Sequence, residues 1–398
     1  MVMPSFPFPE TGAEQMDRAE GIRQLVRLGY EVVVITKVVE WADKAYIEGC
    51  ARELGVRVVM VPYRFSNRVL SHKEKIYKLL GKFKHPLYLD GAAYEYSERE
   101  IVAALTKELV EYKPHVVWFE YTYLWPLYGL VRRAGVPIVT RSLNFEPEHF
   151  LEEDGRTLVN YIKYLAKWFG ERRVVRMSDV VLAITPQEKI LYERMGAAKV
   201  LLLPLRSLSR FTTLPRPEVR ERKPLHVFFM GSSYRVAHNR AGLLLVLKDI
   251  APLLHAQAPG EFVLHILGSK VPEEYKQYFT DECVCEGYVE NLNTFLPTMD
   301  IALVPSLMGA GQQQKVFEPL ARGIVTITTP RAVAGYDFTE GVEYVGATTP
   351  QEYVEALLLL RDKALRDLLS GRALQKSVAL FAQEKLDSTV LAAMPKLT

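Results

Sequence analysis

The sequence has few cysteines and no long hydrophobic run, and each scarcity excludes a class of protein. Its three cysteines, Cys50, Cys283 and Cys285, are too few for a disulfide framework and indicate a reduced, cytoplasmic protein. No run of about eighteen apolar residues occurs, so no transmembrane helix is expected. The opening residues, MVMPSFPFPETG, lack a basic segment, and no secretory signal is expected.

An excess of charge of one sign is also missing. The 398 residues include 50 Lys or Arg and 47 Asp or Glu, which gives a net charge of +3. This balance does not favour nucleic acid as a partner. The sequence also lacks a DxD triplet and a close-spaced pair of histidines on a helix, so we expect no metal site and no resident cofactor.

One segment departs from the charge balance. Residues 64–84 contain seven Lys or Arg and one Glu, with apolar and aromatic residues between them. Two interpretations stay open. In the first, a basic amphipathic helix rests on an anionic bilayer, so that the protein is peripheral at the inner face of a membrane. In the second, the segment is a solvated helix face with a core stripe.

Strand and helix patterns alternate along the chain, and the alternation restarts after residue 224. It predicts two α/β domains, each built on a doubly wound parallel sheet. The expected strands are 30–37, 56–62, 114–120, 137–141, 179–185, 199–204, 225–230, 262–267, 284–287, 300–305, 324–329 and 343–345. The expected helices are 12–28, 39–54, 97–112, 123–134, 186–195, 240–254, 289–297, 312–321, 350–369 and 374–383. The Pro- and Arg-rich residues 206–224 are the expected linker between domains 1–205 and 225–377.

Ligands of such sheets bind beyond the carboxyl ends of the strands, so the loops after the strands hold the candidate residues. After the first strand of the second half, a Gly-Ser turn at 231–233 leads into a helix, whose free N–H groups suit a phosphate. Arg235 and Arg240 would add positive charge there. The alternative is an ordinary strand-to-helix turn with a capped helix. Similar loops follow later strands at 268–270 and 287–289.

The most distinctive loop is PSLMGAGQQQKVFEPLARG, residues 305–323. Lys315 and Glu318 lie three residues apart near the start of its helix. A lysine there suits a phosphate, and a carboxylate can accept from two vicinal ribose hydroxyls. The alternative is a surface ion pair between the two side chains. The loop is not a Walker motif, and no GxGxxG follows a strand, which disfavours a dinucleotide-binding oxidoreductase.

The order of these motifs resembles that of the retaining GT-B glycosyltransferases, specifically the family 4 type. Five segments carry the resemblance. They are PETGAEQMDRAEGIRQLVRLGYEVVVIT, RSLNFE, ERRVVRMSDVVLAIT, GSSYRVAHNRAGLLLVLKDIAPLL, and the block from EGYVENLNTFLPTMD to PRAVAG, which is the most specific. RSLNFE resembles an R-x-H-N-x-E segment of the family, with Leu143 in place of the histidine. GSSYRVAHNRAGLLLVLKDIAPLL resembles the opening of the family's donor-binding domain.

The resemblance implies two Rossmann-like domains that face each other across a cleft, with the acceptor on the first domain and a nucleotide-sugar donor on the second. It also implies a terminal helix, about 378–398, that crosses back to the first domain. Glu318 matches the second glutamate of an E-x7-E motif, whereas the first falls at Ala310. The stretch is closer to a G-x-G-x-x-x-K-x-x-E variant, matched by Gly309, Gly311, Lys315 and Glu318.

The implied chemistry is a metal-independent transfer with retention, by attack on the same face of the sugar. Preorganised N–H groups and cationic side chains would stabilise the charge on the leaving nucleoside diphosphate. The catalytic candidates are Arg235, Lys315 and Glu318. The donor-binding candidates are Gly12, Gly231, Ser232, Ser233, Asn239, Gly268, Gly287, Tyr288, Val289, Gly309, Ala310 and Gly311. The acceptor-side candidates are Glu120, Tyr121, Asn144 and Glu146.

Several alternatives stay open. Glu120 is a candidate base, or else a helix cap or a hinge ion pair. A non-catalytic relative of the same fold fits the alanine at 310 and the leucine at 143, and a nucleotide-sugar epimerase shares the fold. A phosphorylase is disfavoured, because no pyridoxal-phosphate lysine motif is present. The acceptor is a glycan, a lipid-linked molecule or a small molecule. The basic segment, together with Trp118 and Trp125, makes a membrane-borne acceptor reasonable.

Overall fold

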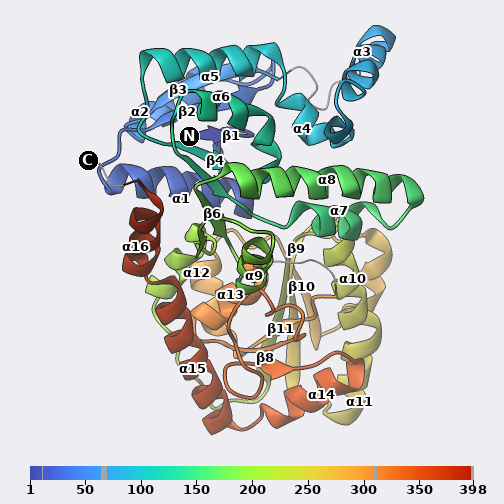
Figure 1. The fold of residues 1–398 in the computed structure, drawn as a ribbon. Helices are drawn as coiled ribbons and strands as arrows, with labels where there is room; N and C mark the ends of the chain where they lie inside the picture. Colours follow the sequence, from blue (N-terminus) through green and yellow to red (C-terminus); the bar gives the residue numbers. More distant parts are fainter. Residues whose placement is uncertain (11, 64–69, 308–311, 396–398) are drawn as a thin grey trace. The chain divides into compact units, whose positions relative to one another are not determined.

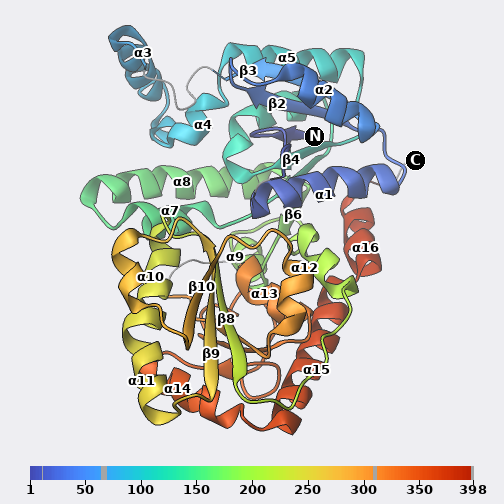
Figure 2. The same cartoon turned by 180° about the vertical axis from the view of Figure 1, so that it is seen from behind.

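The computed structural model describes residues 1–10, 12–63, 70–307 and 312–395. The predicted Gly309, Ala310 and Gly311, and residues 64–69 of the basic segment, lie outside the described residues. The chain divides into two compact units, one of residues 1–207 with 384–398 and one of residues 208–383. Each unit contains one parallel sheet with helices packed against it (Figure 1; Figure 2).

Unit 1 is built on a seven-stranded sheet with the order β3-β2-β1-β4-β5-β6-β7. Its strands are β1 (Val2–Met3), β2 (Val33–Val38), β3 (Arg57–Pro62), β4 (Val117–Glu120), β5 (Ile138–Arg141), β6 (Val180–Ala183) and β7 (Val200–Leu202). The central strands are rich in β-branched residues and buried on both faces, as expected of a parallel sheet covered on both sides.

Helices cover both faces of this sheet. α1 (Ala13–Arg27), α2 (Lys44–Glu53) and α16 (Gln383–Ala393) pack on one face. α4 (Gly91–Glu95), α5 (Arg99–Glu111), η2 (Thr122–Leu127), α6 (Tyr128–Arg133) and α8 (Leu158–Met177) pack on the other. The remaining helices are α3 (His72–Lys82), η1 (Pro86–Leu89), α7 (Glu146–Asp154) and α9 (Pro186–Arg194). The chain passes between the units through η3 (Arg206–Thr213), inside the expected linker.

Unit 2 is built on a six-stranded parallel sheet with the order β10-β9-β8-β11-β12-β13. Its strands are β8 (Leu225–Ser233), β9 (Phe262–Ser269), β10 (Cys283–Gly287), β11 (Ile301–Val304), β12 (Val325–Thr328) and β13 (Val345–Gly346). Its helices are α10 (Ala237–Leu245), η4 (Val246–Ile250), α11 (Ala251–Gln257), η5 (Glu273–Tyr278), α12 (Leu292–Phe295), η6 (Leu296–Thr298), α13 (Gln314–Ala321), α14 (Pro350–Leu359) and α15 (Lys363–Phe381).

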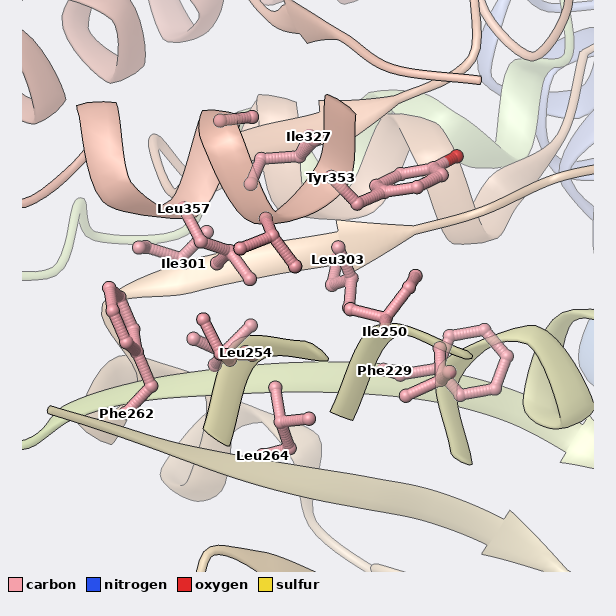
Figure 3. Close-up of a cluster of buried hydrophobic side chains, with 14 of the residues drawn as sticks. Phe229, Ile250, Leu254, Phe262, Leu264, Ile301, Leu303, Ile327, Tyr353 and Leu357 are labelled. Atoms are coloured by element: carbon pink, nitrogen blue, oxygen red, sulfur yellow. The ribbon is translucent and has the colours of Figure 1, made fainter. Parts of the chain in front are cut away.

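The core of unit 2 lies between its sheet and α10, η4, α11 and α14. Figure 3 shows Ile301, Leu303 and Ile327 of the central strands pointing toward Tyr353 and Leu357 of α14. On the other face Phe317 of α13 packs against Phe381 of α15, with ring centroids 4.2 Å apart. These two layers fix where each strand ends, and therefore where the loops after the strands lie.

The predicted pair of doubly wound parallel sheets is confirmed. Several elements differ from the sequence prediction. β1 was not expected, because it is only two residues long. The helices α4, α7 and α8 were also missed. The break expected at 370–373 is wrong: α15 runs unbroken through it, and the break falls at Asp362, which caps α15 by accepting from the Ala364 and Leu365 N–H groups.

The core of unit 2 predicts that two leucines of α14 contribute very differently to the free energy of unfolding. Leu357 of α14 is fully buried, whereas Leu359 is 56% exposed. We expect Leu357→Ala to lower the free energy of unfolding by about 2–5 kcal/mol, because the cavity left behind relaxes only in part. Leu359→Ala should change it by less than about 0.5 kcal/mol. Urea denaturation checks both, and equal losses would contradict this placement of the core.

Candidate functional site

The carboxyl ends of β8, β9, β10, β11 and β12 meet along one edge of the sheet of unit 2. In a doubly wound sheet this edge is where ligands bind, at the point where the strand order reverses. The reversal here lies between β8 and β11, which are neighbours in the sheet although β9 and β10 come between them in the chain. The loops after β8 and β11 are therefore the first to consider.

The loop after β8 is held tightly against β9. The Tyr234 N–H donates to the carbonyl of Ser269 at 3.0 Å, and the Ser269 hydroxyl donates to the carbonyl of Ser232 at 2.8 Å. Gly268 has φ +143°, and a Cβ atom there would overlap the carbonyl oxygen of Gly231. The two predicted glycines thus meet where the backbones of β8 and β9 approach most closely, and both strand ends become one rigid edge.

Asn239 stabilises this loop from the start of α10. It is buried, and its side-chain amide donates to the carbonyl of Ser233 at 3.2 Å and to the Ser232 hydroxyl at 3.4 Å. The predicted donor residue Asn239 therefore positions the Gly-Ser turn. Val236, the residue before α10, makes no side-chain cap. Arg235 and Arg240 are exposed beside the loop.

The loop after β11 leads into α13, where the two predicted residues do not pair with each other. Glu318 is buried and accepts from Arg322, one turn further on, at 2.7 Å from Nη2 and 3.1 Å from Nε. Arg322 also donates to Asn293 Oδ1 at 2.7 Å. Sequence reasoning missed Arg322, although a Glu and an Arg four residues apart on a helix is a known pairing signal. The alternative of a Lys315–Glu318 ion pair is not what the structure has.

Lys315 stands apart from this pair. Burial lowers its pKa to about 8, and no neighbouring charge contributes to that shift. Within the described ranges, which omit 308–311, its ammonium group has no hydrogen-bond or ion-pair partner. A half-buried ammonium group without an anion is costly, because burial disfavours the charged form. Lys315 is therefore placed to gain from any anion that binds at the start of α13.

The start of α13 is fixed from two sides. The Ser306 hydroxyl donates to Gln313 Oε1 at 2.6 Å, and the Tyr336 hydroxyl donates to the carbonyl of Gln313 at 3.0 Å. The predicted Gly287 and Tyr288 follow β10. Gly287 has φ +68° with open space around it, and Tyr288 is 75% exposed, so its ring is free to contact a ligand. Val289 is half-buried next to it.

In unit 1, the predicted Glu120 lies in a cluster of four fully buried charges. Its carboxylate accepts from Arg206 Nη2 at 2.8 Å and from the Trp118 indole N–H at 2.9 Å. Asp17 of α1 pairs with Arg141 and with Arg206. Glu120 has no exposed surface in this structure, which does not favour the acceptor-side role expected for it. Of its alternatives, an ion pair is present, with Arg206 as the partner.

The other acceptor-side residues lie in separate surroundings. Tyr121, with φ +148°, stacks on Tyr123 at 4.6 Å between ring centroids, and the Arg18 guanidinium lies over its ring. Burial raises the pKa of Glu146, and its carboxylate lies 3.6 Å from Lys167 Nζ. The carbonyl of Asn144 accepts from the Ser142 hydroxyl at 3.0 Å.

A buried chain of hydrogen bonds supports the segment of Asn144 and Glu146, and sequence reasoning did not find it. The Tyr192 hydroxyl contacts Ser142 Oγ at 2.9 Å and Glu171 Oε2 at 3.1 Å. Burial raises the pKa of Glu171 to about 8. Because the Ser142 hydroxyl donates to the carbonyl of Asn144, this chain of hydrogen bonds helps to orient the segment.

Gly12 is the residue before α1 in unit 1 and has extended backbone without a side-chain cap. A cavity of about 350 Å³ in unit 1, lined by Val33, Val117, Trp118 and Met394 among others, lies at the amino ends of β1, β2 and β4, away from the ligand-binding edge. Within residues 1–10, 12–63, 70–307 and 312–395, no helix is long and apolar enough to cross a membrane, and no cluster of three His, Cys, Asp or Glu suits a metal ion.

Comparison with known families agrees with this architecture. Residues 18–206 match the model of a glycosyl transferase 4-like domain, and residues 224–363 match that of glycosyl transferases group 1. The chain belongs to the GT-B glycosyltransferases of the family 4 type. No curated protein matches it in sequence.

Solved structures of GT-B glycosyltransferases share this fold at low sequence identity. HepE from Anabaena, crystallised with UDP, is 14% identical with a TM-score of 0.64, covering 100% of this chain and 99% of that one. Sucrose-phosphate synthase from Thermosynechococcus elongatus is 15% identical with a TM-score of 0.62, covering 98% and 96%. TarM is 8% identical with a TM-score of 0.68, covering 99% of both chains.

The junction of β8 and β9 gives a test of how this edge of the sheet is built. Gly268→Ala should lower the free energy of unfolding by more than about 3 kcal/mol, because the new methyl group overlaps the Gly231 carbonyl oxygen in addition to the unfavourable φ. Gly260→Ala, also at positive φ but with no atom within 4 Å, should cost about 1 kcal/mol. Urea denaturation compares the two, and equal costs would show that the two strands do not meet here.

Proposed function

We propose that this glycosyltransferase moves a sugar from a nucleoside-diphosphate sugar to an acceptor, with retention and without a metal ion. The observation that carries the proposal is Lys315, a half-buried ammonium group that has no anionic partner among the described residues and lies where a parallel sheet binds ligands. HepE, one of the similar structures, has been crystallised with UDP and with UDP-glucose, which supports a nucleotide-sugar donor.

In the proposed site the diphosphate lies between the loops after β8 and β11. Lys315 meets its charge from α13, while Arg235 and the N-terminal end of α10 meet it from the other loop. In the transfer, the bond between the anomeric carbon and the phosphate oxygen breaks, and the acceptor oxygen bonds to that carbon from the same face. The acceptor proton leaves with the phosphate, so the reaction requires no enzymic nucleophile and no metal-bound water.

Glu318 remains the proposed ribose ligand, with Arg322 as its support. Arg322 contacts Oε1 of this carboxylate, and one oriented oxygen is enough to accept from a hydroxyl. The same pairing favours a second candidate, a non-catalytic relative, because an occupied Glu318 and the alanine at 310 leave fewer groups for the sugar.

The acceptor part of the proposal concerns the membrane. We propose a lipid-linked acceptor and contact of residues 64–84 with an anionic bilayer, in a protein that works at the cytoplasmic face. α3 covers most of the described part of this segment. Its apolar side chains Ile76, Leu79 and Leu80 are all more than half exposed, which favours the membrane interpretation over a core stripe.

The pKa of Lys315 gives a pH test of donor binding. Its folded pKa of about 8 lies below the usual value, so the empty site loses the lysine charge as the pH rises through 8. If only the charged form binds the diphosphate, the affinity for it should fall about tenfold between about pH 7 and pH 9. Lys315→Arg should bind with little change over that range, since arginine stays charged. Lys315→Met should bind weakly at both values.

Isothermal titration with UDP, GDP, ADP and CMP, with NAD as the unrelated control, measures these affinities. A thermal shift with each nucleotide, without added metal, first selects the one that binds. The proposal for Lys315 fails if the nucleotide binds the methionine variant as tightly as the natural protein at pH 7.

Turnover separates an enzyme from a non-catalytic relative. With the sugar nucleotide of the base selected above, we expect slow release of the free sugar that is unchanged by EDTA and falls more than about a hundredfold in Lys315→Met, the loss typical of one charge-stabilising group. The released sugar, followed by NMR at early times, should carry the anomeric configuration of the donor. Nucleotide binding without any turnover would favour the non-catalytic relative, and loss of activity in EDTA would contradict metal independence.

A further inference from the structure

The outward face of α8 is apolar over its first three turns. Leu158, Ile162, Leu165 and Phe169 recur at the spacing of one helix face and are 81%, 51%, 54% and 47% exposed. A helix of a soluble protein normally turns such a stripe toward the core. Here the stripe faces solvent, and an exposed apolar stripe of this kind marks an interaction site.

Contacts on the inward face of α8 explain why the apolar stripe is not rotated toward the core. Glu171 and Asn160 are buried, and Glu171 accepts from the Thr122 hydroxyl at 2.5 Å. At Gly170 the helix lies so close to Trp125 that a Cβ atom would be 3.0 Å from the indole nitrogen. The polar contacts and this close approach fix the inward face, and they leave the apolar stripe outside.

α3 carries a second exposed apolar face. Its start is fixed by a capping box between Ser71 and Glu74, and Gly81 packs directly against the Tyr94 hydroxyl of α4. The side of α3 away from Gly81 is apolar and open to solvent. It carries Ile76, Leu79 and Leu80, with Phe83 directly after the helix, and these side chains are 55–70% exposed.

The two helices belong to one region of unit 1. The short helix η1 contacts both α3 and α8. Lys82 of α3 and Lys163 of α8 lie close enough for each charge to act on the other. Figure 1 and Figure 2, which view the molecule from opposite sides, both show α3 and the start of α8 extending from the same side of unit 1.

Basic residues border both apolar faces. Arg172, Arg173 and Arg176 continue the outward face of α8 beyond the stripe, and Lys73 and Lys75 flank that of α3; all five are exposed. The only acidic residues of the two helices are unavailable to balance them. Glu74 is taken by the cap of α3, and Glu171 is buried. An apolar face bordered by lysine and arginine is the pattern of helices that lie in an anionic membrane interface.

We propose that α3 and α8 together form a two-helix surface, the α3–α8 face, that binds an anionic lipid bilayer. The face consists of the apolar residues named above on the two helices and their basic border. A second copy of the chain fits less well as the occupant, because a two-fold symmetric contact would set the basic border of one copy against that of the other. The inference rests on the acceptor part of the proposed function, and it adds α8, which the basic segment 64–84 does not include.

Vesicle binding of the whole chain tests the proposal. The probes are vesicles of phosphatidylcholine alone and vesicles with about 30% phosphatidylglycerol, the latter giving the negative surface to which basic side chains are attracted. We expect co-sedimentation with the anionic vesicles only, and binding that weakens more than about tenfold when salt rises from about 0.1 M to about 0.5 M. Binding to neither vesicle would overturn the proposal.

Variants assign the binding to the face. Leu79→Gln, Leu80→Gln, Ile162→Gln and Leu165→Gln combined should reduce binding by more than about tenfold, because each removes apolar area that would enter the interface. The matched control is Val110→Gln with Leu359→Gln, two leucine- or valine-to-glutamine changes at exposed sites on other helices. It should bind like the natural chain, and equal losses in both would overturn the assignment to the α3–α8 face.

Two further readouts keep the outcomes apart. All variants should keep the natural melting temperature and the nucleotide-induced shift without vesicles, so a failure of donor binding is distinguishable from a failure of membrane binding. Sedimentation velocity without lipid tests the other occupant. A natural chain that dimerises, beside a four-glutamine variant that stays monomeric, would overturn the proposal in favour of an interface between copies. A variant of α3 alone, Leu79→Gln with Leu80→Gln, that lost all binding would overturn the part assigned to α8.

Discussion

The cluster of Asp17, Glu120, Arg141 and Arg206 joins the parts of unit 1 on which its carboxyl edge depends. Glu120 ends β4, Arg141 ends β5, Asp17 lies in α1, and Arg206 lies where the chain leaves the unit. Four buried charges carry a large desolvation cost, which their mutual attraction offsets only in a fixed geometry. Loss of any one partner would leave an uncompensated charge in the interior. The cluster therefore sets the ends of two central strands and the exit of the chain in a single arrangement.

Lys315 and Glu318, the two candidate charged residues of α13, differ in whether the described residues supply a partner of opposite charge. Glu318 is buried and pairs with Arg322 at 2.7 Å. Lys315 is half-buried without an anionic partner among the described residues, and burial lowers its pKa. A ligand that brings negative charge therefore supplies the lysine with a partner that the glutamate already has. This asymmetry is why the proposal rests on Lys315, and why the glutamate is assigned to orientation of the donor.

The repeat of strands and helices could be predicted from the sequence because parallel strands, buried on both faces, read as short apolar runs between turn residues. The elements that were not predicted from the sequence depend on tertiary contacts. α8 shows its apolar residues to solvent and buries Glu171, so its pattern is the reverse of the usual one. β1 has too few paired residues to be seen as a run. For the site, the glycines of the β8 and β9 loops could be found from their positions after strands, whereas the Glu318–Arg322 pair needed a choice between two partners for one carboxylate.

The surface of unit 1 and the ligand edge of its sheet are linked through α4. Lys78 of α3 donates to Glu95 at 2.7 Å, and the Tyr63 hydroxyl donates to the same carboxylate at 2.5 Å just beyond the end of β3. Lys37, near the end of β2, contacts the carbonyl of Glu95 and pairs with Glu98 at 2.6 Å. The helix that we propose enters the lipid interface is thus tied by charged contacts to the strand ends where an acceptor would bind. Contact with a bilayer would then hold the acceptor edge at a fixed distance from the head groups, which suits a substrate whose lipid part stays in the membrane.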